Sequence, residues 1–363
     1  MIVFFLVCIA PIIVASHAKT ITLSNTRLPR DNLGRELITG EATFLYVHQE
    51  GLYFAYFNNW GGCRGVDCCL SGGGCAGCCF SPPSQTYPDA CVYTNNHTVV
   101  AYSTSNFADW TYEGTVMGVA DRLLGIEFRP QVVYSQLLQL YLMWYEDRWS
   151  EGTNHGYAIN AAPSPRGPFR PYASSIVLPG SGRVGDYDIF IDDDGVAYHL
   201  RTGLTITQLN ATLNGPSGKY GSLPDRSLEG PSMFKRNGIY FILAGRGCCA
   251  CKGGSNIRVY SSSVSPLGPY VFQGDVGSRT DKPFDRHSPD NYITRAQQTK
   301  VLEVRGEGGI SQYLWVGNQW VTSTLPGNPR NNDLLYWSVL EFTSDTSIRQ
   351  FAYRPTCNLS IAD

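Results

Sequence analysis

The sequence repeats one short pattern, an apolar strand, a tight turn and a second apolar strand, five times along its length. The clearest copy runs from Ser227 to Leu243. There, Asn237-Gly238 separates two apolar runs, which is the strongest short-range signal for a β-hairpin. The second strands of the other four copies span 51–57, 140–145, 195–200 and 312–316. Irregularly spaced copies of one strand-rich unit are typical of propeller blades. The sequence therefore predicts an all-β fold, a five-bladed β-propeller with a central channel.

A second element also repeats, since the turn Ser164–Phe169 returns as Ser265–Tyr270, each time after a strand. The content of 38 Gly, 21 Pro and 22 Tyr favours strands and turns over helices. Propellers of this length commonly form one domain. We therefore expect residues 19–363 to form a single propeller.

The N-terminal segment is expected to be a secretory signal peptide, residues 1–18. Residues 2–14 are almost wholly apolar, and small residues follow at 15–18. This run is too short to span a bilayer, and no later segment approaches a membrane span. The sequence thus predicts a secreted, extracellular glycoprotein, with sequons at Asn96, Asn210 and Asn358.

Most of the twelve cysteines lie in one insertion of blade one, residues 61–91. In a secreted protein these are expected to form disulfides. The alternative is a zinc site, because Cys75 and Cys78 have ligand-like spacing, but no second pair with clean spacing follows. We therefore expect no metal and no cofactor. Without Cys8 the number of cysteines is odd, so at least one thiol stays free or pairs with another chain.

The formal net charge of −2 and the lack of a basic run argue against nucleic-acid binding. We expect a monomer whose partner is a neutral, polar molecule such as an oligo- or polysaccharide.

Three acidic residues stand at the beginnings of predicted inner strands: Glu41 in blade one, Asp186 in blade three and Glu229 in blade four. Most acidic residues at a protein surface only contact water and have no further function. Inner strands of a propeller surround one channel, however, so these three carboxylates would converge. Glycoside hydrolysis requires a proton donor and a base that activates water, which such a group could supply.

Four residues of blade two are candidate substrate contacts: Glu127, Arg129, Trp144 and Tyr145. Each has a structural alternative. The arginine could pair with an acid, and aromatic residues on strands are more often part of the core.

The chain resembles glycoside hydrolase family 43, five-bladed propeller enzymes, and within it the branch of exo-β-1,3-galactanases. The resemblance rests on Asp186 with 190–195 and Tyr198, on 229–231 with 238–240, on 265–269, and on 294–299 with 313–317 and Trp320.

This resemblance implies an inverting mechanism. Glu229 matches the general acid, and Asp186 matches the residue that tunes its pKa. Glu41 is the nearest match to the general base, which is an Asp in the family. Gln297 matches a glutamine that positions water in the galactanase branch. That branch also has a Glu directly before Arg-Pro, whereas here Phe128 intervenes after Glu127. Galactan, arabinan and xylan all remain candidate substrates.

Two other functions stay open. The first is a propeller that has lost catalysis and binds carbohydrate. The second is an interaction protein that displays the Cys-rich insertion, since a fold does not determine a function.

Overall fold

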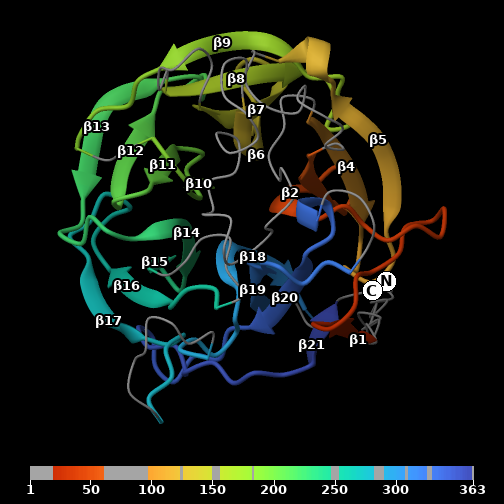
Figure 1. The fold of residues 1–363 in the computed structure, drawn as a ribbon. Helices are drawn as coiled ribbons and strands as arrows, with labels where there is room; N and C mark the ends of the chain where they lie inside the picture. The colour runs from red at the N-terminus through yellow and green to blue at the C-terminus, as the bar shows by residue number, and fades with distance from the viewer. Residues whose placement is uncertain are drawn as a thin grey trace, which may run out of the picture.

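The computed structural model describes residues 19–60, 97–122, 126–148, 156–181, 184–246, 253–281, 290–306, 310–324 and 329–361. Five antiparallel sheets stand around a common axis, each with its first strand innermost (Figure 1). The predicted five-bladed β-propeller is confirmed. The predicted signal peptide and the Cys-rich insertion 61–91 lie outside the described residues.

The strands follow one another in order from the inside of each blade outwards. Blade one consists of β2 (Gly40–Val47), β3 (Leu52–Asn59), β4 (Thr98–Thr104) and β5 (Thr111–Met117). Blade two consists of β6 (Ile126–Ser135), β7 (Leu140–Arg148), β8 (Gly156–Ala162) and β9 (Arg170–Ile176). Blade three consists of β10 (Tyr187–Ile191), β11 (Ala197–Arg201), β12 (Thr205–Leu209) and β13 (Pro216–Ser222). Blade four consists of β14 (Glu229–Arg236), β15 (Ile239–Gly245), β16 (Arg258–Ser262) and β17 (Val271–Asp275). Blade five has three strands, β18 (Gln297–Arg305), β19 (Ser311–Gln319) and β20 (Leu334–Val339).

The repeated sequence patterns occupy equivalent positions. The five apolar runs are the second strands β3, β7, β11, β15 and β19. Asn237 and Gly238 join β14 to β15 with φ of 50° and 77°, the left-handed pair that a tight hairpin turn needs. Both copies of the Ser-Pro-x-Gly-Pro turn join the third strand of a blade to the fourth.

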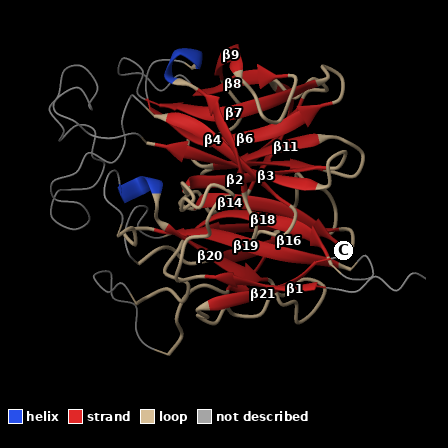
Figure 2. Cartoon of the chain, turned by 90° about the vertical axis from the view of Figure 1, so that its right-hand side faces the viewer, coloured by secondary structure: helices blue, strands red, loops and turns tan. Residues whose placement is uncertain are grey.

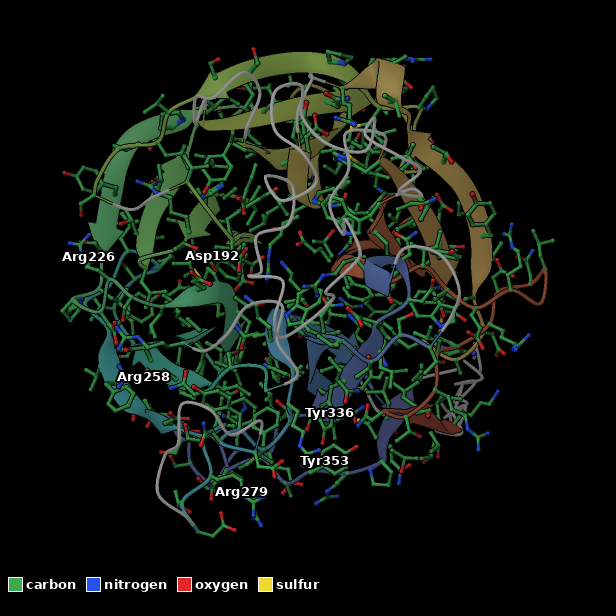
Figure 3. All side chains as sticks on the ribbon, viewed as in Figure 1. Asp192, Arg226, Arg258, Arg279, Tyr336 and Tyr353 are labelled. Atoms are coloured by element: carbon green, nitrogen blue, oxygen red, sulfur yellow. The ribbon has the colours of Figure 1, made fainter. Side chains whose placement is uncertain are left out.

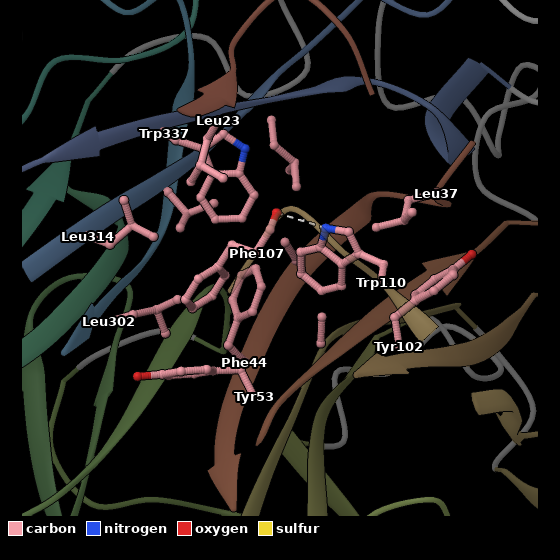
Figure 4. Packing of buried hydrophobic residues seen from close by; sticks show 14 of the residues in the cluster. Leu23, Leu37, Phe44, Tyr53, Tyr102, Phe107, Trp110, Leu302, Leu314 and Trp337 are labelled. Atoms are coloured by element: carbon pink, nitrogen blue, oxygen red, sulfur yellow. Dashed lines mark hydrogen bonds between the residues drawn. The ribbon is translucent and has the colours of Figure 1, made fainter. Parts of the chain in front are cut away.

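The hydrophobic core lies between the blades. There are five buried clusters, one at each junction of neighbouring blades. At the junction of blades five and one, Phe44 packs against Phe57, Phe107 and Trp337, with ring centroids 6.0–6.4 Å apart (Figure 4). In the same cluster, Trp110 Nε1 donates to the carbonyl of Phe107 at 2.9 Å.

The ring closes where the ends of the described chain meet. Strands β1 (Lys19–Ser24) and β21 (Thr356–Ile361) pair antiparallel beside blade five (Figure 1). The outer edge of β20 is covered by side chains: Asn25 bonds both backbone groups of Trp337, and Gln319 donates to the carbonyl of Leu335 at 3.3 Å. These contacts block an edge that could otherwise pair with another strand.

The described helical segments are two short 3-10 turns, η3 (Val119–Asp121) and η5 (Pro329–Asn331), which lie on the same side of the strands (Figure 2). No helix in the described part of the chain is long and apolar enough to cross a membrane.

Candidate active site

Four of the five inner strands carry a β-bulge at the same end. The register shifts between Gly40 and Thr43 in β2, between Phe128 and Gln131 in β6, between Glu229 and Ser232 in β14, and between Gln298 and Lys300 in β18. Glu41 and Arg129 have φ of 52°, and Gly230 has φ of 56°. A bulge redirects side chains and interrupts the regular alternation of a strand. Polar residues at these positions therefore face one another across the axis.

Two of the bulges need a glycine because the backbone of a neighbouring strand lies very close. A Cβ on Gly230 would lie 2.7 Å from the carbonyl oxygen of Gln298, and the φ of Gly230 is positive. A Cβ on Gly40 would lie 2.2 Å from the carbonyl oxygen of Asn58. Both contacts are with backbone atoms, so a larger residue would displace the bulges that precede Ala42 and Ser232.

Arg129 is the centre of the site. Its Nε lies 2.9 Å from Asp186 Oδ1, and its backbone N–H donates to Glu41 Oε2 at 3.0 Å. Burial alone would lower the pKa of Arg129, but the carboxylates of Asp186 and Glu41, with Glu146 and Glu229, raise it above its ordinary value. One cation from blade two is thus surrounded by acids from blades one, two, three and four.

Asp186, which directly precedes β10, connects three further elements. Its Oδ2 accepts from the backbone N–H of Gly230 at 3.2 Å and from Gln297 Nε2 at 3.2 Å. Its backbone carbonyl accepts from the N–H of Thr202 at 2.8 Å. Its side chain remains 21% exposed, so its position is fixed and solvent can still reach it.

Glu41 is buried, with 8% of its surface exposed. Burial raises its pKa to about 7, and the charge of Asp186 adds to this increase, whereas the charge and backbone N–H of Arg129 oppose it. A carboxylate with this pKa can take up and release protons near neutral pH.

Glu229 is exposed at the first position of β14, where it pairs with Gly245. Glu229 directly precedes Gly230, whose N–H donates to Asp186. The negative charge of Glu229 also raises the pKa of Arg129. The structure therefore brings Glu41, Asp186 and Glu229 to one end of the axis, as the sequence predicted. Their catalytic roles remain predictions.

Gln297 lies at the first position of β18, and its side chain joins the same group. Its Nε2 faces Asp186, and its Oε1 accepts from Trp320 Nε1 at 2.8 Å. The guanidinium of Arg330 lies over the ring of Trp320, 4.4 Å from the centroid. Its positive charge also counteracts the increase in the pKa of Glu41.

Beneath this group lies a second polar layer around Asp188 of β10. Its carboxylate accepts from Gln131 Nε2 at 3.0 Å, Ser232 Oγ at 2.9 Å and the N–H of Met233 at 2.8 Å, and it forms an ion pair with Lys300. On the far side, a cavity of about 950 Å³ reaches Gln131 and Lys300 from the other end of the inner strands.

The four candidate substrate contacts of blade two are all buried, so their role in binding substrate stays a prediction. Trp144 has no exposed surface, packs against Tyr157 and His199, and donates to the carbonyl of Leu213 at 3.1 Å. Tyr145 is 1% exposed and donates to Asn160 Oδ1 at 3.0 Å. Strand aromatics here fill the junctions between blades, which was the structural alternative.

Glu127 and Arg129 of blade two have different partners. Glu127 is 1% exposed, and its carboxylate lies 3.9 Å from both His97 and Arg122. Phe128, the residue between Glu127 and Arg129, packs beside Trp60 with centroids 5.4 Å apart. Arg129 is only 3% exposed and contacts Asp186 and Glu41, which is the structural alternative of pairing with an acid.

Sequence reasoning missed Glu146 in β7. It is 1% exposed, lies opposite Phe128 in the sheet, and raises the pKa of Arg129. The signal was present, because a glutamate ends the apolar run of the second strand of blade two.

The acidic segment 192–194 lies in the turn between β10 and β11. Asp192 accepts from Lys235 Nζ and from Tyr240 Oη, both at 2.7 Å, and so connects blades three and four (Figure 3). Among the described residues, no cluster of three or more His, Cys, Asp or Glu side chains is arranged to hold a metal ion. Cys357 is a buried free thiol, and the other cysteines lie outside the described residues.

A family model for glycosyl hydrolases family 43 matches residues 89–324, about two thirds of the chain. The match includes Arg129, Asp186, Glu229, Gln297 and Trp320, and it begins after Glu41.

Solved structures of similar fold agree with this match. A family 43 β-1,3-galactosidase superposes with a TM-score of 0.68 at 18% identity, covering 91% of this chain and 100% of that one. An exo-β-1,3-galactanase from Phanerochaete chrysosporium gives 0.65 at 18% identity, with 92% and 67% coverage. One from Clostridium thermocellum gives 0.64 at 20% identity, with 92% and 66% coverage.

In sequence, the chain is 29% identical to a β-D-galactofuranosidase of Aspergillus niger over 161 residues, 39% of this chain. The match spans 46% of that relative, just under half of its length.

Proposed function

Because the chain belongs to glycosyl hydrolases family 43, we propose that it is a secreted, exo-acting glycosidase that cleaves galactose-containing glycans with inversion of the anomeric carbon. The observation that carries the proposal is the Arg129 centre, which holds Glu41 and Asp186 in fixed positions beside the exposed Glu229. An inverting glycosidase needs two carboxyl groups with different proton affinities and a means of orienting them.

The proposed roles follow from burial and contacts. Glu229 is exposed and therefore able to reach a glycosidic oxygen as the general acid. Asp186 lies between Arg129 and the backbone of Gly230, and so sets the charge and orientation next to that acid. Glu41, with its pKa raised to about 7 by burial, is the candidate base that takes a proton from water.

Gln297 is the alternative group for holding the nucleophilic water. Its amide lies beside Asp186, and a neutral amide can orient a water molecule without removing its proton. Glu41→Gln and Gln297→Ala separate the two assignments. If Glu41→Gln is fully active and Gln297→Ala is inactive, Glu41 is not the base.

Exo-action is supported by the relatives, because the solved structures of similar fold include exo-β-1,3-galactanases. Asp188 has no exposed surface, and its bonds to blades two, four and five form a floor directly under Asp186.

The galactose preference rests on the relatives. Solved structures of similar fold include β-1,3-galactosidases and exo-β-1,3-galactanases, and the relative from Aspergillus niger is a β-D-galactofuranosidase. The test is a panel of chromogenic galactopyranoside, galactofuranoside, arabinofuranoside and xyloside, together with β-1,3-galactan. We expect release of single galactose units. Cleavage of only the arabinoside or xyloside would overturn the galactose preference.

The stereochemistry has its own test. In inverting enzymes the two carboxyl groups lie roughly 6.5–9.5 Å apart, whereas a separation of roughly 5 Å belongs to retaining enzymes. NMR of the product anomer in the first minutes should show inversion. Carbohydrate binding without cleavage of any substrate would favour a non-catalytic binding protein instead.

Secretion is part of the proposal because of the apolar segment 2–14 and the small residues that follow it. Expression in a eukaryotic secretory host should give a mature protein that begins at Lys19. Retention of residues 1–18 on the purified protein would contradict it.

A further inference from the structure

We propose that Trp320 is a positioning residue for the reaction, because it fixes the orientation of the Gln297 amide so that Asp186 faces an N–H. The inference rests on the proposed function and concerns a side chain that is 3% exposed and donates its indole N–H to Gln297.

The hydrogen-bonding groups of Trp320 and Gln297 determine how the amide is oriented. The indole N–H of a tryptophan can only donate, whereas a glutamine amide has one acceptor atom and one donor atom of similar shape. Trp320 Nε1 lies 2.8 Å from Gln297 Oε1, so the pair is satisfied in one orientation of the amide only. That orientation turns Nε2 towards Asp186 Oδ2, 3.2 Å away. The reverse orientation would bring two acceptors together at Asp186 and two donors together at Trp320.

The indole itself is held from its other side. The guanidinium of Arg330 lies 4.4 Å from the ring centroid, and Arg330 pairs with Asp333 at 3.4 Å. Asp333 Oδ1 accepts from the N–H of Thr322 at 2.9 Å and of Ser323 at 3.2 Å, the residues that follow Trp320 in the chain. Arg330 and Asp333 have no exposed surface. The buried Arg330–Asp333 pair thus fixes the loop that follows Trp320 and the position of its indole ring. The indole ring in turn fixes the orientation of the Gln297 amide.

A neighbouring pair shows what such a contact does when it has only a structural role. Trp315 Nε1 donates to Gln298 Oε1 at 2.8 Å, the same arrangement one residue further along β18. Gln298 Nε2, however, donates to the backbone carbonyls of Gly230 at 2.7 Å and Leu243 at 2.6 Å. Gln298 therefore links strands, whereas Gln297 presents its donor to an ionisable side chain at the site.

For the reaction, this means that the donor and acceptor atoms of the Gln297 amide point in fixed directions. Gln297 Oε1 has two lone pairs, of which Trp320 uses one, and the other can accept from a water molecule. Without the indole N–H, the amide could turn, and Asp186 would lose a donor part of the time. A hydrogen bond to a charged group contributes enough that its loss corresponds to roughly tenfold to hundredfold in rate.

The first experiment compares Trp320→Phe with Trp110→Phe. Both remove one indole N–H from a buried ring, but Trp110 donates to the Phe107 carbonyl within the hydrophobic cluster between blades five and one (Figure 4). In Trp320→Phe we expect kcat to fall about tenfold to hundredfold with KM changed less than about twofold. Trp110→Phe should keep the wild-type kcat and KM. A folded Trp320→Phe variant with wild-type kcat overturns the proposal.

A second measurement keeps the inference separate from activity. In nitrogen-15 NMR, the indole N–H of Trp320, assigned by its loss in Trp320→Phe or by sequential assignment, should be protected from hydrogen exchange. In Gln297→Leu that protection should be lost, while the Trp110 resonance stays unchanged. If the wild type cleaves no glycoside, the proposed function fails, and this experiment still tests the pairing. Unchanged protection in Gln297→Leu would overturn it.

Discussion

Two carboxylates two residues apart, Asp186 and Asp188, lie one above the other on the axis and have opposite characters. Asp188 is fully buried and is held by Gln131, Ser232, the N–H of Met233 and Lys300. Asp186 is 21% exposed and has Arg129, the N–H of Gly230 and Gln297 as partners, the last two at 3.2 Å.

The two carboxylates differ in how many hydrogen-bond donors they can still accept. An ionised carboxylate has about four sites for donors, and Asp188 uses all of them inside the protein. Asp186 is accessible to water and lies beside the exposed Glu229 and the buried Glu41. The lower layer therefore joins blades two, three, four and five, whereas in the upper layer Glu41 can change its protonation and a ligand can reach Asp186 and Glu229. Substitutions in the upper layer should therefore affect activity most, and those in the lower layer stability.

Glu229→Gln should produce the largest loss of activity. On substrates with poor leaving groups we expect kcat to fall by about a hundredfold to ten-thousandfold, the usual contribution of general acid catalysis. On an activated aryl glycoside the loss should be much smaller, because that leaving group departs with little protonation. The melting temperature should stay within a few degrees of wild type, since the side chain is exposed. An equal loss on both substrates would contradict the role of proton donor.

Lys300→Met should show the opposite behaviour, a loss of stability with little change in kcat. It leaves the buried charge of Asp188 without its cation, which typically costs about 3–5 kcal/mol of unfolding free energy. Denaturant titration measures this, and kcat is read well below the new midpoint. The matched control is Lys235→Met, with an expected cost of about 1 kcal/mol or less, because its partner Asp193 is 87% exposed and its partner Asp192 keeps the bond from Tyr240. Equal costs for the two variants would contradict the special place of the lower layer.

The protonation of Glu41 should make activity and stability change in opposite directions with pH. Burial raises its pKa in the folded protein from 4.5 to about 7, so between these values the folded state binds more protons than the unfolded state. The unfolding free energy should therefore fall by about 3 kcal/mol as pH rises through this window. If ionised Glu41 is the base, kcat should rise over the same range. Glu41→Gln should remove both slopes, and a wild-type stability slope in that variant would assign the titration to another group.

The fold could be predicted because its signals are local. Each hairpin carries its own apolar runs and turn residues, and Asn237-Gly238 adopts the backbone that this dipeptide favours. The placement of Glu41, Asp186 and Glu229 could also be anticipated, because each lies within two residues of the start of an inner strand, and inner strands share one axis.

The contacts of blade two could not be derived in this way. A β-bulge between Phe128 and Gln131 breaks the alternation on which any assignment of strand faces depends, so Glu127 and Arg129 could not be placed by counting. Trp144 illustrates a second limit. The sequence does not distinguish a strand aromatic residue that contacts a ligand from one that packs against the next blade. In this structure, Trp144 packs against Tyr157 of blade two and His199 of blade three.

The smallest expected effect tests whether the two layers are mechanically independent. Ser232→Ala removes one of the donors to Asp188 and also the acceptor for the N–H of Val301, which lies 2.9 Å from Ser232 Oγ. Asp188 keeps Lys300, Gln131 and the N–H of Met233, so the cost should be about 1–3 kcal/mol of unfolding free energy, below that of Lys300→Met. Because Ser232 has no contact with Asp186, kcat, KM and the pH profile should match wild type. If kcat instead falls more than about tenfold with full folding, then Asp188 transmits its position along β10 to Asp186, and the lower layer belongs to the catalytic arrangement after all.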